Sequence, residues 1–126
     1  MGATNRQSDS NESRQQRRER YETLLRVLAL QTTDVQGPAA RRHSIKHNLA
    51  MQGYAADKID STIRAACEQD DIWSFVGPDG VARLALMTKD DLRRVIEWLV
   101  EMEHPHKELI GRANGKLKEV EDGEHC

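Results

Sequence analysis

Residues 72–86 read IWSFVGPDGVARLAL, and this stretch decides the fold. Its two halves, 72–76 and 81–86, follow the period of two that is typical of β-strands. Between them, Gly77-Pro78-Asp79-Gly80 supplies a proline that presets one turn dihedral and glycines that accept positive ones. The stretch therefore predicts a two-stranded β-hairpin.

The sequence before the hairpin changes to helical spacing. Residues 14–30 carry the apolar stripe Tyr21, Leu24, Leu25 and Leu28 behind a basic first half that contains Arg14, Arg17, Arg18 and Arg20. Residues 41–52 place Ile45 and Leu49 four apart, and Gly53 follows as a C-cap glycine. Residues 56–69 repeat the spacing with Ile59, Ile63, Ala66 and Cys67. Two helices joined by so short a turn predict a helix-turn-helix unit whose second helix has a polar outer face.

A further helix is expected after the hairpin. Thr88 is a good N-cap, and the residues that follow place Leu92, Val95, Ile96, Leu99 and Met102 on one face. Pro105 interrupts this helix. Residues 107–120 have a last amphipathic pattern, which Gly111 and Asn114-Gly115 weaken as a continuous helix, and residues 121–126 are expected to be a frayed acidic tail.

Composition narrows the class of protein. A chain of 126 residues is enough for one small domain, and no apolar run approaches the roughly 18 to 20 residues of a membrane span. Neither an apolar leader nor a disulfide framework is recognisable, because the only cysteines are Cys67 and Cys126. We expect a cytoplasmic protein that does not associate with membranes.

The order helix, helix, turn, helix, hairpin, long helix resembles the winged helix-turn-helix domain of prokaryotic and archaeal transcription regulators. The likeness is carried by the residues Ile45, Leu49, Gly53-Tyr54, Ile59, Ile63, Ala66, Ile72, Gly80, Leu84 and Leu86. The flanking helices look like the dimerisation helices of MarR-like and PadR-like members. The resemblance implies a mostly α fold with a small β-hairpin, divided into a disordered tail at 1–13, the winged domain with its flanking helices at 14–103, and a C-terminal helix and acidic tail at 104–126.

The resemblance also implies a site for double-stranded DNA. In such folds the helix after the turn enters the major groove, and the wing reaches an adjacent groove or the backbone. With Ile59, Ile63 and Ala66 turned inward, the residues expected to contact bases are Lys58, Ser61, Thr62 and Arg64. The residues expected to contact phosphates are Arg41, Arg42 and Lys46, which lie in a basic stretch without an acidic residue between Asp34 and Asp57. Arg83 is the cation that the wing offers, and the arginines at 14–20 are expected to form a flexible electrostatic arm.

Acidic residues argue against tight DNA contact and keep a second hypothesis open. Asp57, Asp60 and Glu68 lie on the recognition helix, and the wing tip carries Asp79. A basic helix start can also be a solvated face. The net charge is only −2, with 12 basic and 11 acidic residues at 1–87 against 7 and 10 at 88–126. The alternative is a winged-helix protein-protein interaction module that does not bind DNA.

Dimerisation follows from the apolar stripes of the long helices. The stripes at 21–28 and 92–99 are expected to pack together. The apolar surface that this packing leaves exposed is expected to be buried against a second copy of the chain across a two-fold axis. Such a homodimer would place two recognition helices about one DNA turn apart, roughly 34 Å, and would read a palindromic site. The other possibility is that residues 107–120 fold back and cover the same surface within one chain.

Metal and enzyme chemistry are not expected. His104-Pro105-His106 and His125-Cys126 do not have the spacing of a closed zinc site, and Cys67 falls on the buried side of its helix. The sequence contains no nucleophile elbow, phosphate-binding glycine loop, dinucleotide fingerprint or catalytic-base pairing. We therefore expect neither a catalytic site nor a cofactor.

Overall fold

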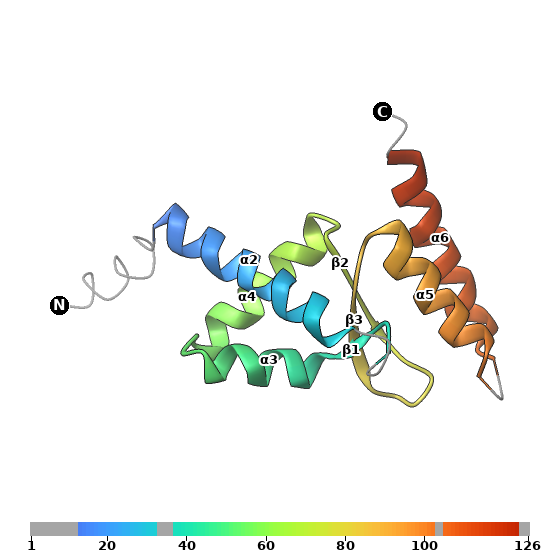
Figure 1. The fold of residues 1–126 in the computed structure, drawn as a ribbon, viewed down its shortest axis with the longest axis horizontal. Coiled ribbons are helices and arrows are strands. Elements are labelled where there is room, and N and C mark those ends of the chain that lie inside the picture. The colour runs from blue at the N-terminus through green and yellow to red at the C-terminus, as the bar shows by residue number, and fades with distance from the viewer. Residues whose placement is uncertain (1–12, 33–36, 103–104, 124–126) are drawn as a thin grey trace.

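The structure is a computed structural model that describes residues 13–32, 37–102 and 105–123 (Figure 1). The helices are α2 (Arg14–Gln31), α3 (Arg42–Met51), α4 (Ala56–Glu68), α5 (Lys89–Val100) and α6 (Lys107–Gly123), and the strands are β1 (Ala40–Arg41), β2 (Ile72–Val76) and β3 (Ala82–Leu86). The coarse class expected from the sequence, mostly helical with a small β component, is confirmed. The predicted tail at 1–13 lies outside the described residues except for Ser13.

The hairpin forms where the sequence predicts it and gains a third strand. Strands β2 and β3 pair antiparallel from Ile72 opposite Leu86 to Val76 opposite Ala82. Strand β1 pairs with the other side of β3, so the sheet order is β1-β3-β2. The helix predicted from residue 41 therefore begins one residue later, because Arg41 is a strand residue opposite Arg83.

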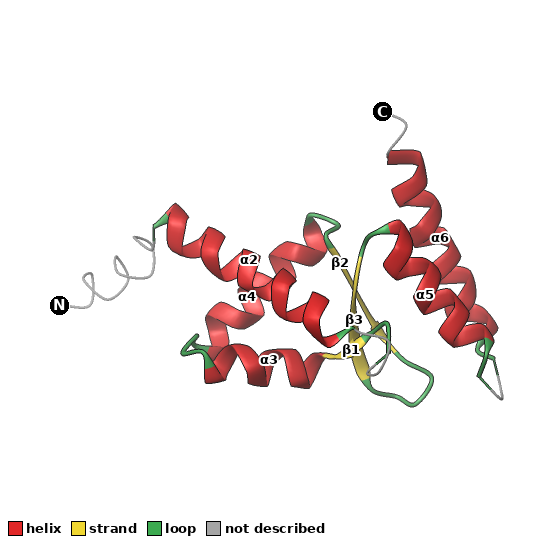
Figure 2. Ribbon diagram, viewed as in Figure 1, coloured by secondary structure: helices red, strands yellow, loops and turns green. Residues whose placement is uncertain are grey.

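The sheet lies between two layers of helices (Figure 2). Alternate residues of a strand face opposite sides, so each face of the hairpin enters a different apolar cluster. Ile72 and Leu84 pack with α2, α3 and α4, whereas Trp73, Phe75 and Ala85 pack with α5 and α6. The hairpin holds the two helical layers together because both of its faces are apolar.

The expected packing of the 21–28 stripe against the 92–99 stripe is wrong. Leu24 and Leu28 of α2 lie in the cluster with α3 and α4, and Leu92 and Leu99 of α5 lie in the other cluster, across the sheet. The apolar face of α5 meets α6, where Leu109 is buried. The fold-back of residues 107–120 within one chain is the arrangement that the structure has.

Local signals account for the ends of the helices. Ser13 and Gln16 form a reciprocal capping box at the start of α2, in which each side chain accepts from the other residue's backbone N–H. Gly53 has φ +101° after α3, and Thr88 caps α5 by accepting from the Asp91 N–H. These signals act within one helical turn, which is why the sequence predicts them well.

Helix α6 is longer and more regular than expected. It runs through Gly111 and Gly115 without interruption and continues to Gly123, so Glu121 and Asp122 belong to a helix and not to a frayed tail. The cluster around Leu109 and α5 compensates for the weak helix propensity of the glycines. Among the described residues, no helix combines the length and apolar character needed to cross a membrane.

Candidate nucleic-acid interface

Helix α4 presents a polar face because its apolar residues are used by the core. Ile59, Ile63 and Ala66 are buried against α2, α3 and the sheet. Ser61 and Arg64 are consequently exposed, on a stripe that also contains Asp57 and Glu68. The predicted outward positions Ser61 and Arg64 are therefore available for contact with a partner.

Three cations and one carboxylate lie together where α3 and α4 meet. Lys46 Nζ lies 2.8 Å from Asp60 Oδ1, and this contact lowers the pKa of Asp60 below its ordinary value. The charges of Arg42 and Arg64 act in the same direction. Asp60 is thus neutralised by Lys46, and Arg42 and Arg64 remain as the local surplus of positive charge around a depression of about 480 Å³.

The other border of α4 is formed by the basic first half of α2. Arg17 and Arg18 line a depression of about 570 Å³ together with Ser61 and Ala65 of α4. The expectation of a flexible arm at residues 14–20 is wrong, because these residues form the first turns of α2 behind the capping box at Ser13. The arginines at 17 and 18 therefore stand at a fixed place beside the outer face of α4.

Thr62 does not face outward, contrary to the prediction. Its side chain is only 4% exposed, and its Oγ1 accepts a hydrogen bond of 2.6 Å from Arg20 Nε. The same hydroxyl donates to the Lys58 carbonyl at 2.7 Å. Arg20 is itself 6% exposed, so it crosslinks α2 and α4 inside the domain. Helical spacing in α4 gives no sign of this contact, because the partner comes from 42 residues earlier.

The three predicted phosphate contacts do not lie together. Arg42 and Lys46 share the side of α3 that faces α4. Arg41 belongs to β1 and lines a different, broader depression of about 1000 Å³ with His43 and His47. Arg41 is thus a strand residue, and it lies apart from the two cations of α3.

Arg83 is held inside the hairpin and is not a free cation of the wing. Its Nη2 lies 2.9 Å from Asp79 Oδ2, its Nη1 donates to the Ala39 carbonyl at 3.0 Å, and its guanidinium lies over the Trp98 ring. The side chain is 11% exposed. The hydrogen bond from Arg83 lowers the pKa of Asp79. Arg83 was expected to be the cation that the hairpin offers to DNA, but its guanidinium instead ties the turn to Ala39, just before β1, and to α5.

The remaining predicted residue, Lys58, is partly buried on the α2 side of α4. It lines a small depression with Glu19, Arg20 and Tyr54 near the turn between α3 and α4. This position is at the edge of the exposed face of α4. Of the eight predicted residues, Ser61, Arg64, Arg42 and Lys46 are the ones that the structure brings to one surface.

Metal binding gains no support from the described part of the chain. It contains no group of three His, Cys, Asp or Glu side chains that could hold an ion. Cys67 is half-buried, and burial raises the pKa of its thiol. The predictions about His104, His125 and Cys126 concern residues outside the described part.

Comparison with known proteins gives no relative. The chain matches no family model, no curated protein sequence and no solved structure.

Proposed function

We propose that this protein is a winged helix-turn-helix transcription regulator that binds duplex DNA as a homodimer. The observation that carries the proposal is the outer face of α4. Ser61 and Arg64 are exposed there, and cations of two other helices, Arg17 and Arg18 of α2 and Arg42 of α3, stand on its two sides. A helix that enters the major groove between two phosphate backbones needs this distribution of charge.

The order of the elements supports the same proposal. A short strand between α2 and α3 completes the sheet, and the hairpin follows α4, as in a winged helix whose second and third helices form the helix-turn-helix. In the proposed complex Arg64 reads a base edge, with guanine as the preferred partner of an arginine. Ser61 contacts a base or a phosphate, and Arg42 and Lys46 contact phosphates.

The acidic residues of α4 weaken the proposed DNA contact less than their number suggests. Asp60 is paired with Lys46 and lies among two further cations. Asp57 is in the first turn of α4, where a carboxylate stabilises the helix. Glu68 at the last turn is the remaining acid on the exposed stripe, and it marks the end of the proposed contact.

Fluorescence anisotropy with random-sequence duplex DNA tests the proposal. Binding is expected to weaken by orders of magnitude between about 50 and 200 mM salt, because each phosphate contact releases counterions. The variant Arg42→Ala/Arg64→Ala is expected to bind more weakly, with a salt slope that falls by about 1 for each phosphate ligand removed. Arg93→Ala is a control with an exposed arginine on α5, outside the proposed surface.

Two outcomes would contradict the proposal. If the protein does not bind duplex DNA at the lowest salt, the alternative of a protein-protein interaction module takes its place. If the protein binds DNA but Arg42→Ala/Arg64→Ala behaves as Arg93→Ala does, the assignment of the surface is wrong. Selection from a random DNA library then tests the dimer, which requires a palindrome with half-sites about one turn apart.

A further inference from the structure

The basic surface of α3 and α4 continues across the edge of the sheet to α6. The depression bordered by Arg42 and Arg64 reaches Cys67 and Ser74. A second depression of about 450 Å³ has the same two residues on one side and Arg112 and Lys116 of α6 on the other. Cys67 and Ser74 thus join the two depressions into one groove.

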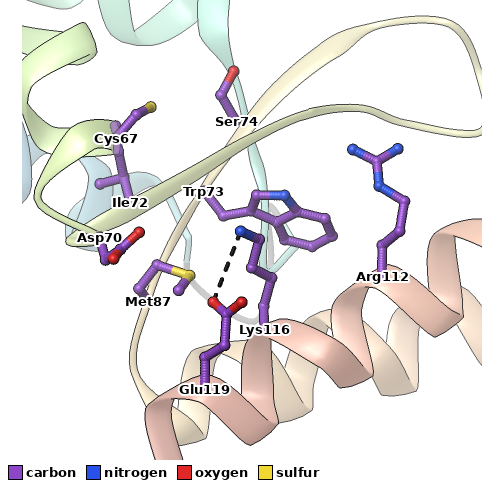
Figure 3. A pocket seen from close by; sticks show the side chains of 9 residues that line it. All are labelled: Cys67, Asp70, Ile72, Trp73, Ser74, Met87, Arg112, Lys116 and Glu119. Atoms are coloured by element: carbon purple, nitrogen blue, oxygen red, sulfur yellow. Dashed lines mark ion pairs between the residues drawn. The ribbon is translucent and has the colours of Figure 1, made fainter. Parts of the chain in front are cut away.

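The cations of the two sides converge on Cys67. Burial raises the pKa of this thiol, and the charge of Glu68 acts in the same direction, whereas the positive charges of Arg42 and Lys116 act to lower it. Arg42 is 74 residues away from Lys116 in the chain, yet each lines a depression that Cys67 also lines. Figure 3 shows Arg112 and Lys116 projecting from α6 into the second depression, with Cys67 and Ser74 on the side away from this helix.

The groove has a surplus of positive charge. Its cations, which we call the basic strip, are Arg42, Lys46, Arg64, Arg112 and Lys116. Lys46 is paired with Asp60 and Lys116 with Glu119. The other carboxylate that lines the groove is that of Asp70, so the three arginines of the strip exceed it in charge.

The groove follows the open edge of β2. The backbone bonds from the Met87 N–H to the Asp71 carbonyl and from the Gly77 N–H to the Val81 carbonyl set the alternation of this antiparallel pair. The backbone groups of Ile72, Ser74 and Val76 therefore point away from β3, and the Ser74 N–H is directed to the Cys67 sulfur. Polar backbone groups and cations thus line the same path.

We propose that the basic strip binds the phosphate backbone of DNA and extends the α4 interface over the edge of β2 onto α6. This inference rests on the proposed function. It adds α6 as a DNA-contacting element, with Arg112 and Lys116 as phosphate ligands. DNA contacts made outside the recognition helix carry little sequence information, but they set the register and orientation of the protein on the duplex.

The composition of the groove favours a nucleic-acid backbone over a peptide strand. A peptide that adds to a sheet edge needs pockets for alternate side chains as well as backbone bonds. The large apolar residues beside the edge, Trp73 and Met87, are only 5% and 9% exposed and are already used by the core. What the groove offers instead is charge spread over three helices, which fits a row of phosphates.

The first test uses the variant Arg112→Ala/Lys116→Ala. Its control is Arg93→Ala/Lys118→Ala, which removes the same charge from α5 and α6 at positions that do not line the groove. Alanine is the best helix former, so both variants are expected to keep α6 folded. Removing two phosphate ligands reduces the salt slope by about 2, so the affinity ratio of wild type to variant shrinks about tenfold between 50 and 200 mM salt.

The second test uses Cys67 as a reporter in the Cys126→Ser background. Saturating duplex DNA is expected to slow alkylation of Cys67 by N-ethylmaleimide several-fold, because the backbone covers the groove. The Arg112→Ala/Lys116→Ala variant is expected to lose part of this protection, whereas the control variant keeps it.

The outcomes separate this inference from the proposed function. If wild type binds DNA and Arg42→Ala/Arg64→Ala weakens binding, but Arg112→Ala/Lys116→Ala matches its control, the inference is overturned and the function stands. The same holds if bound DNA leaves the alkylation of Cys67 unchanged. If wild type binds polyglutamate but not DNA, both fail and the groove is a site for an acidic polypeptide.

Discussion

Replacing Thr62 by valine tests whether this residue belongs to the core or to the DNA interface. Valine has nearly the same shape but cannot accept the hydrogen bond from Arg20 Nε, which is 2.6 Å long and buried. A hydrogen bond to a charged group contributes about 1.5–3 kcal/mol, and the guanidinium loses this acceptor in a buried place. We therefore expect Thr62→Val to lower the free energy of unfolding by about 1.5–3 kcal/mol.

Urea unfolding followed by circular dichroism measures this decrease. For a chain of this length, about 1 kcal/mol corresponds to roughly 4 °C in Tm, so Tm is expected to fall by about 6–12 °C. Ser61→Ala is the matched control, because Ser61 also loses a hydroxyl but is exposed and donates only to the Asp57 carbonyl of its own helix. The control is expected to change stability by less than about 0.5 kcal/mol.

Either of two results would refute this reasoning. If Thr62→Val is as stable as Ser61→Ala, the contact with Arg20 does not stabilise the domain. If the folded Thr62→Val variant, measured well below its Tm, binds DNA far more weakly than wild type while remaining stable, Thr62 contacts DNA as the sequence suggested.

Three further predictions concern the turn, the hairpin and α6. Gly53→Ala is expected to lower the free energy of unfolding by about 1–2 kcal/mol, because Gly53 has φ +101°. Gly115→Ala in α6 is expected to raise it by up to about 1 kcal/mol, because alanine is the better helix former. Urea unfolding of both variants measures the two changes. Arg83 lowers the pKa of Asp79 below its ordinary value of 3.8, so their pair stabilises the fold above that pH and is lost as the pH falls below it. Wild type is therefore expected to lose stability more steeply than Asp79→Asn below pH 4, and equal slopes in acid unfolding would contradict this. Leu109→Ala is expected to lower the free energy of unfolding by about 2–5 kcal/mol and to make α6 susceptible to trypsin, because Leu109 is buried. A variant as stable as wild type would mean that α6 does not depend on its packing against α5.

The homodimer remains a prediction, and the structure removes one of the reasons for it. The apolar stripe of α5, which was expected to pack against residues 21–28 and leave a surplus apolar surface for a second copy, is covered by α6. The exposed large apolar residues of the described part, Leu30, Met51, Val76 and Val100, are distributed over four elements. Sedimentation velocity with and without a selected palindromic duplex tests the prediction, and a protein that binds such a duplex only as one copy would exclude the homodimer.

Predictions from local sequence succeeded where the cause is itself local. Thr88 caps α5 because its hydroxyl reaches an N–H three residues away, and Gly53 ends α3 because only glycine takes a positive φ without strain. The hairpin at 72–86 follows from alternation and from the turn at 77–80. The apolar spacing of Ile59 and Ile63 likewise determined which face of α4 turns inward, so the exposure of Ser61 and Arg64 could be predicted.

Contacts between distant segments decided the rest, because nothing in a single helix or strand specifies its partner. Strand β1 has two residues and exists only beside β3, and it directs Arg41 away from Arg42. Arg20 buries Thr62 from 42 residues away. The sequence by itself thus determined the helices, the hairpin and the apolar residues that they bury, through interactions between residues close together in the chain. Only the tertiary structure, by bringing α6 beside the open edge of β2, decided which cations share a surface.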